Sequence, residues 1–142
     1  MTNSDRPRLI LHGAIVLLVG LLCGLPTVVE AIDESARVWH TAHEALIMTG
    51  IWILAASSLL PALLLPRREA TALVWLLIVM GYGFVVALVL GGAIGVSPFE
   101  PGHTPAAFVA FVAALVGIFG AVLSAALTIR GAAAALKAAR EP

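Results

Sequence analysis

The segment Trp39–Gly50, WHTAHEALIMTG, places His40, His43 and Glu44 at the beginning of a long apolar run. His43 falls inside this run, and an ionisable side chain at membrane depth usually marks a functional position because burying it without a partner is costly. A neutral imidazole is a good ligand for haem iron, with its second ring nitrogen donating to a backbone carbonyl. Axial ligation of haem iron by His43 is therefore the leading hypothesis. A histidine that bonds only to a loop carbonyl or to water is the alternative.

The neighbouring polar residues allow a second interpretation, a zinc site. His40, Glu44 and the loop residue His103 are expected on the same side of the membrane as His43, and three or four such ligands suit zinc. Glu44 also stands three residues after Thr41, which is the spacing of a capping box and predicts that a helix starts at Thr41. Capping is then the simplest role for Glu44.

The remaining histidine of interest, His12, lies in the first apolar run, near the opposite side of the membrane from His43. The expected difference in depth is about 22 Å, from the rise of roughly 15 helical residues. One iron cannot bind both residues within one chain, so its face opposite His43 would stay open to act as a Lewis acid or to bind a small molecule. Trp39 is expected to be an aromatic anchor at the membrane interface.

The elements that must position these residues are four charge-poor runs in a chain of 142 residues, 61% of them hydrophobic. Each run is long enough to cross a hydrocarbon core of about 30 Å at about 1.5 Å per residue. We predict an all-α fold, a four-transmembrane-helix bundle in a single integral membrane domain over residues 1–142. Its helices are expected at about 9–29, 42–65, 71–96 and 105–133. The first run also resembles a signal peptide cleaved after Ala31, although it is longer than is usual for one.

Basic residues are concentrated at the connections that would share one side of the membrane. They are Arg6, Arg8, Arg67, Arg68, Arg130, Lys137 and Arg140, whereas the other two connections hold only Arg37. This positive-inside pattern predicts that both termini are cytoplasmic, in a multi-pass protein of the inner or cell membrane surrounded by the lipid bilayer. The net charge of zero gives no indication of nucleic-acid binding.

Small residues recur at the spacing typical of close helix packing in membranes. They are Gly20 with Gly24, Gly91 with Gly95, and Ala113 with Gly117 and Ala121. The contacts could lie within one chain or between chains. Because four helices enclose little interior, we expect a homo-oligomer.

Several of these residues resemble the styrene oxide isomerase family. Trp39, Ala42 and His43, followed by Gly50 and then Leu60-Pro61, resemble its second helix in identity and spacing. Looser matches are Leu11-His12-Gly13, Gly81-Tyr82-Gly83 and Pro101-Gly102. The related hydroxylaminobenzene mutases share the opening His-Gly, the Gly-Leu-Leu-x-Gly-Leu run and the Ala-His element with its later glycine.

The resemblance implies a homotrimer with haem b between protomers, ligated by His43. Ferric iron would act as a Lewis acid that rearranges a small apolar epoxide to an aldehyde. The mutases instead rearrange an aryl hydroxylamine to an aminophenol. The candidate cofactor-binding residues are then His43, Trp39, His40 and Arg37.

The same resemblance gives three candidate catalytic residues. Thr49 stands where the isomerase has an asparagine, and Leu88 aligns with a tyrosine of the isomerase. Tyr82, the single tyrosine of the chain, lies about a turn and a half before Leu88. Because Thr49 is about 120° around its helix from His43, it is expected to face the haem of a neighbouring protomer. Two other functions stay open, a non-catalytic haem protein and a membrane scaffold with structural histidines.

Overall fold

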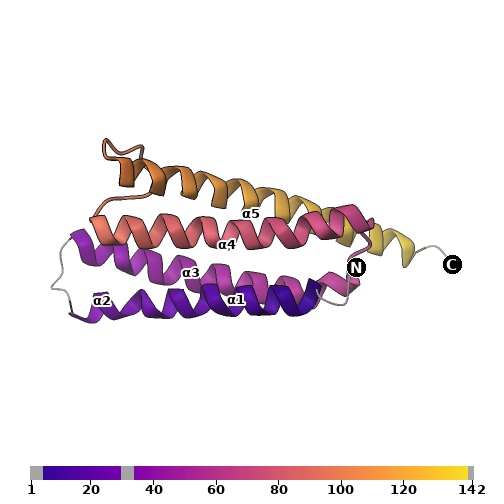
Figure 1. Ribbon diagram of the computed structural model, residues 1–142. Coiled ribbons are helices and arrows are strands. Elements are labelled where there is room, and N and C mark those ends of the chain that lie inside the picture. Colours follow the sequence, from indigo (N-terminus) through magenta and orange to yellow (C-terminus); the bar gives the residue numbers. More distant parts are fainter. Residues whose placement is uncertain (1–4, 30–33, 141–142) are drawn as a thin grey trace.

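The computed structural model describes residues 5–29 and 34–140, and within these ranges every regular element is helical. The elements are α1 (Asp5–Leu22), α2 (Gly24–Val29), α3 (Glu34–Leu59), the 3₁₀ helix η1 (Leu60–Ala62), α4 (Arg67–Ile94) and α5 (Pro105–Ala138). They run up and down, so that the start of α1 and the end of α5 lie at the same end of the molecule (Figure 1). Because all of these elements are helices, the predicted all-α fold is confirmed.

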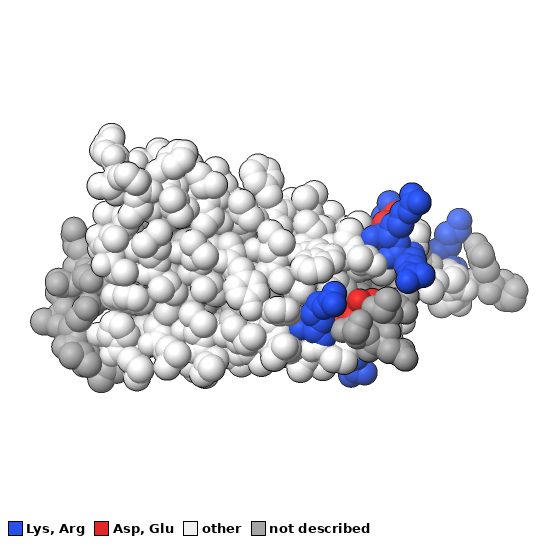
Figure 2. All heavy atoms as spheres, viewed as in Figure 1, with Lys and Arg blue, Asp and Glu red and all other residues white. Residues whose placement is uncertain are grey.

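Four helical segments are long and apolar enough to cross a membrane, Asp5–Thr27, Arg37–Ala62, Arg67–Ile94 and Pro105–Ala138. The prediction of four spans is therefore confirmed, and the chain is a multi-pass membrane protein by length and composition. Arginine and lysine side chains gather at the end of the molecule where α1 begins and α5 ends (Figure 2). There Arg130 forms an ion pair with Glu69 at 3.0 Å, and the guanidinium of Arg8 lies over the ring of Trp75 at 5.4 Å.

Two predicted helix boundaries are wrong. The second helix begins at Glu34 rather than at residue 42, so Thr41 lies inside α3 and its hydroxyl donates to the carbonyl oxygen of Arg37 at 3.1 Å. Thr41 and Glu44 therefore form no capping box. The first predicted helix is divided at Cys23 into α1 and α2. The signal-peptide alternative, with cleavage after Ala31, concerns a position outside the described residues.

Helix α1 packs closely against α3, and α4 packs closely against α5. A Cβ atom added at Gly20 would lie 2.7 Å from the backbone nitrogen of Ile47, and one added at Gly83 would lie 2.8 Å from that of Gly117. Both glycines thus allow backbones to approach where any side chain would collide. The small-residue positions of α1 and α5 are used for packing within the chain, so they give no separate support for self-association.

The buried core lies where α1, α3 and α4 meet, and includes Val16, Leu46, Ile53 and Leu77. Helix α5 packs mainly along α4, and Figure 1 shows it at the outer edge of the helix layer. Its opposite side is apolar and exposed, as expected for a surface in contact with lipid tails. The bundle is therefore open on the side of α5.

Candidate functional site

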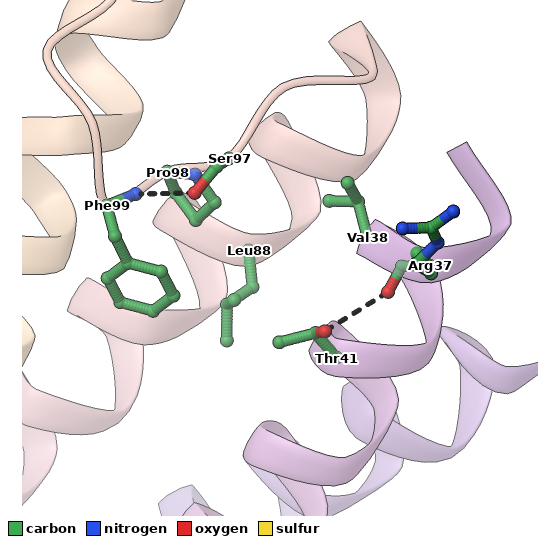
Figure 3. A pocket seen from close by; sticks show the side chains of 7 residues that line it. All are labelled: Arg37, Val38, Thr41, Leu88, Ser97, Pro98 and Phe99. Atoms are coloured by element: carbon green, nitrogen blue, oxygen red, sulfur yellow. Dashed lines mark hydrogen bonds between the residues drawn. The ribbon is translucent and has the colours of Figure 1, made fainter. Parts of the chain in front are cut away.

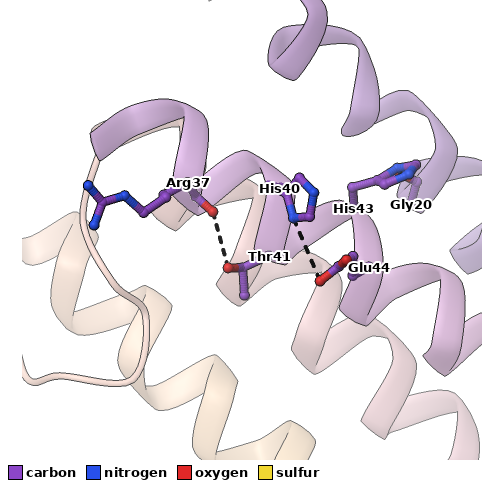
Figure 4. Close-up of polar contacts among 6 residues, drawn as sticks. All are labelled: Gly20, Arg37, His40, Thr41, His43 and Glu44. Carbon is purple, nitrogen blue, oxygen red and sulfur yellow. Dashed lines mark hydrogen bonds and ion pairs between the residues drawn. The ribbon is translucent and has the colours of Figure 1, made fainter. Parts of the chain in front are cut away.

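The side chain of His43 is half-buried between α3 and the junction of α1 with α2. Its Nδ1 lies 2.8 Å from the carbonyl oxygen of Gly20, and Figure 4 shows the ring directed toward that residue. A carbonyl oxygen only accepts hydrogen bonds, so Nδ1 must carry the proton. The lone pair of the imidazole is then on Nε2, which is the arrangement of a histidine that ligates a metal.

The Gly20 carbonyl is available because helix α1 ends beside it. The last hydrogen bond of α1 joins the Cys23 N–H to the Val19 oxygen, and α2 begins at Gly24. Pro26 explains the interruption, since proline has no N–H and its ring clashes with the carbonyl four residues earlier, that of Leu22. The chain therefore breaks its helix at the level of the His43 ring.

Gly24 lies against the same imidazole. A Cβ atom at this position would be 2.8 Å from Nδ1 and 2.9 Å from Cε1 of His43. Those distances are shorter than van der Waals contact, so only glycine leaves room for the ring where it stands. The sequence reasoning assigned Gly20 and Gly24 to packing and missed their relation to His43. The run Gly-Leu-Leu-Cys-Gly-Leu-Pro, with a proline inside an apolar helix, was the available signal.

The residues considered for zinc do not assemble. His40 pairs with Glu44 on the exposed side of α3, with 3.6 Å between Nδ1 and Oε2. His103 lies in the exposed loop between α4 and α5, in a pocket with Glu100 and Thr104. Within residues 5–29 and 34–140, no three His, Cys, Asp or Glu side chains come together in a group that could hold a metal ion. Within one chain, these residues therefore do not form the zinc site that was considered.

The haem-ligand hypothesis needs only one residue of this set, His43. It requires one half-buried imidazole with a fixed tautomer, and His43 meets that requirement through Gly20 and Gly24. Trp39, predicted as an interfacial anchor, packs against α4. Atoms of its ring lie 2.9 Å from where a Gly92 Cβ would be, so the ring fills the α3–α4 contact.

A cavity lies between α3, α4 and the loop that follows α4 (Figure 3). It has a volume of about 140 Å³ and is lined by Arg37, Val38, Thr41, Leu88, Ser97, Pro98 and Phe99. Leu88 is 1% exposed, and the exposed Arg37 lies at the rim on α3. Arg37 and His43 are six residues apart, about 120° around the helix, so this cavity opens on a different side from the His43 ring.

The other two candidate catalytic residues lie apart from His43. Thr49 donates its hydroxyl to the Ala45 oxygen of its own helix at 2.7 Å. The hydroxyl of Tyr82 lies 2.9 Å from Nδ1 of His12, with the two rings edge to face. Within one chain, Thr49, Tyr82 and Leu88 therefore do not converge on His43.

A comparison with models of known protein families identifies the family of this chain. The family model described as styrene oxide isomerase matches residues 5–133, which is most of the chain and includes His43. This chain belongs to the styrene oxide isomerase family. The resemblance drawn from the sequence is confirmed, and the family name indicates isomerase activity. No curated protein and no solved structure matches this chain significantly.

Proposed function

We propose that this member of the styrene oxide isomerase family is a haem b-dependent integral membrane isomerase in which Nε2 of His43 would hold the iron. The observation that carries the proposal is the hydrogen bond from Nδ1 to the Gly20 oxygen, which leaves Nε2 as the free nitrogen. Ferric haem, when bound, would supply a Lewis acid for the oxygen of a small apolar epoxide. The rearrangement to an aldehyde moves a substituent between neighbouring carbons, so it consumes no electrons and needs no second substrate.

The protein's own part in this reaction is to hold the iron ligand and to enclose an apolar substrate. The cavity beside Leu88 is close in volume to an engineered apolar cavity of about 150 Å³ that binds benzene. Val38, Leu88 and Phe99 give part of it an apolar lining against which a ring-sized group could pack. Leu88 offers no hydrogen bond, which favours an apolar substituent at this position.

The His43 ring and the Leu88 cavity belong to different sides of α3, so one chain does not bring them together. In a closed ring of copies, the cavity of one protomer would face the His43 of the next. We therefore propose a homotrimer with haem between protomers and both termini cytoplasmic. The charged end of the molecule in Figure 2 supports that orientation through the positive-inside rule.

The visible absorption spectrum of the detergent-purified protein tests the proposal. We expect a Soret band that His43→Ala abolishes and that His12→Ala leaves in place, because His12 is held by Tyr82 away from His43. Product analysis with styrene oxide and with hydroxylaminobenzene then separates an isomerase of either kind from a haem carrier. An unchanged spectrum with full haem content in His43→Ala would refute the ligand assignment.

A further inference from the structure

The junction between α1 and α2 contacts the imidazole of His43 through two glycines of one short segment, which also contains a proline. Gly20 accepts the Nδ1 hydrogen bond, Gly24 lies against the ring, and Pro26 follows two residues later. None of the three has a side chain that can donate or accept a hydrogen bond. They act on His43 only through backbone geometry and through the space that they leave.

We propose that Gly24 and Pro26 are positioning residues that hold His43 in the Nδ1–H tautomer with Nε2 free. The importance of a free Nε2 for binding iron rests on the proposed function. The tautomer of His43 is a property of this chain alone.

Pro26 acts by ending the helix at the required place. In an unbroken helix the oxygen of Gly20 would accept a hydrogen bond from the N–H of residue 24. One of its two lone pairs would then be used within the helix and would not be available to His43. Because the proline interrupts the helix, the final hydrogen bond of α1 stops at the Val19 oxygen, one carbonyl before Gly20. The Gly20 oxygen is one of the carbonyls that every helix end leaves to be satisfied from outside, and His43 satisfies it.

Gly24 acts by its missing side chain. The ring atoms Nδ1 and Cε1 of His43 occupy the space that a Cβ would need, at 2.8 and 2.9 Å. Any other residue would push the ring away from Gly20 and lengthen the 2.8 Å hydrogen bond. The hydroxyl of Thr27 donates to the Gly24 oxygen at 2.6 Å, which fixes the backbone of the junction independently of the ring.

The hydrogen bond has a chemical consequence for the free nitrogen. Donation from Nδ1–H to a carbonyl raises the basicity of the ligating nitrogen and fixes the ring orientation. Loss of such a partner typically weakens metal binding about 10- to 100-fold. A weaker donor also stabilises ferric iron less, so the reduction potential should rise.

The decisive experiment measures the tautomer of His43 in the full-length chain purified without added haem. In the ¹⁵N spectrum of histidine-labelled protein, the His43 signal is assigned by its loss in His43→Gln. We expect the Nδ1–H form in the wild type. We expect a mixture with the Nε2–H form in Gly24→Ala, where the ring is displaced. We expect the same in Pro26→Ala, where loss of the clash with the Leu22 carbonyl lets the helix continue and the Gly24 N–H bond to the Gly20 oxygen.

Gly13→Ala is the matched control for disturbance of the α1–α3 contact. A Cβ at Gly13 would meet the side chains of Ile53 and Leu54 at 3.1 Å, on the same helix pair but away from His43. This variant should keep the Nδ1–H form. Pro26→Ala adds no bulk to the contact, so it tests the proposal even where Gly24→Ala fails to fold.

The haem-loaded protein supplies the second readout. We expect Gly24→Ala and Pro26→Ala to retain haem about 10-fold less tightly or worse, and to show a more positive reduction potential than Gly13→Ala. An unchanged Nδ1–H form in both folded variants would overturn the positioning role. If His43→Ala keeps the haem spectrum, the proposed function fails instead, while the tautomer measurement still decides the role of Gly24 and Pro26.

Discussion

At the scale of single residues, the histidines at membrane depth have specific partners on other helices. His43 donates to Gly20, and Nδ1 of His12 lies 2.9 Å from the hydroxyl of Tyr82. Burying a polar group without a partner is expensive in the membrane, so each pair also holds two helices together. The two pairs differ in whether they fix the histidine tautomer. The Gly20 carbonyl oxygen can only accept, so Nδ1 of His43 carries the proton, whereas the Tyr82 hydroxyl can donate or accept.

The pair of His12 and Tyr82 should contribute to stability rather than to haem ligation. In a double-mutant cycle of His12→Leu and Tyr82→Phe, we expect a coupling free energy of about 0.6 kcal/mol and at most about 1.7 kcal/mol, the range for hydrogen bonds between membrane helices. Unfolding in detergent measures the coupling, and absorption measures the haem. No coupling, or loss of haem in Tyr82→Phe, would show that the pair has another role.

At the scale of the helices, α5 depends on glycines of α4 for its position. The nearest atoms to a Cβ at Gly83 are backbone atoms of α5, at 2.8 Å for the Gly117 nitrogen and 3.0 Å for the Ala113 oxygen. Backbone atoms cannot move aside as the end of a side chain can. The whole helix would have to shift, so the α4–α5 contact is more sensitive to this position than to its exposed neighbours.

Gly83→Ala should destabilise the protein by about 1–3 kcal/mol through this overpacking. Gly95→Ala is the contrasting variant, because a Cβ there meets nothing within 4 Å while φ is +68°. It should cost about 1–2 kcal/mol through the left-handed backbone alone. Thermal unfolding gives both values, and limited proteolysis should show a loosened α5 in Gly83→Ala only. Equal proteolysis of the two variants would contradict the close α4–α5 contact.

At the scale of the whole molecule, the proposed site needs surfaces from two copies. The His43 ring and the Leu88 cavity lie on different faces of α3, while both are near the end of the molecule opposite to the chain's charged end. Self-association would bring these faces together without any change in the helices. The exposed Thr41 at the cavity offers a way to block the cavity while leaving the core intact.

Mixed oligomers provide the corresponding test. Native mass spectrometry should show a trimer, and His43→Ala and Thr41→Trp should each be inactive alone, the first without its iron ligand and the second with a filled cavity. When the two variants are co-expressed, activity should partly return, because one interface pairs an intact His43 with an open cavity. The reverse result, no recovery in oligomers shown to be mixed, would place the whole site within one chain.

Much of this protein follows from its sequence because hydropathy and charge are properties of contiguous segments. The four apolar runs gave the four spans, and the arginines gave the charged end, without any knowledge of packing. His43 was also recognisable, as a polar ring inside an apolar run. The boundary at Thr41 was predicted wrongly because a capping pattern is short and recurs inside helices, where the same hydroxyl bonds back to its own backbone.

The tertiary structure decided which groups meet. The partner of His43 comes from residue 20, and the partner of Tyr82 from residue 12, and both depend on the register in which α1 packs against its neighbours. Register is set by the glycines that allow close approach and by the break before Pro26, acting together over many residues. The sequence by itself determined that the ring of His43 would need a hydrogen-bond acceptor such as a backbone carbonyl. Only the packed helices determined that the carbonyl belongs to Gly20, because a backbone oxygen becomes available only where the folded chain leaves its helix unfinished.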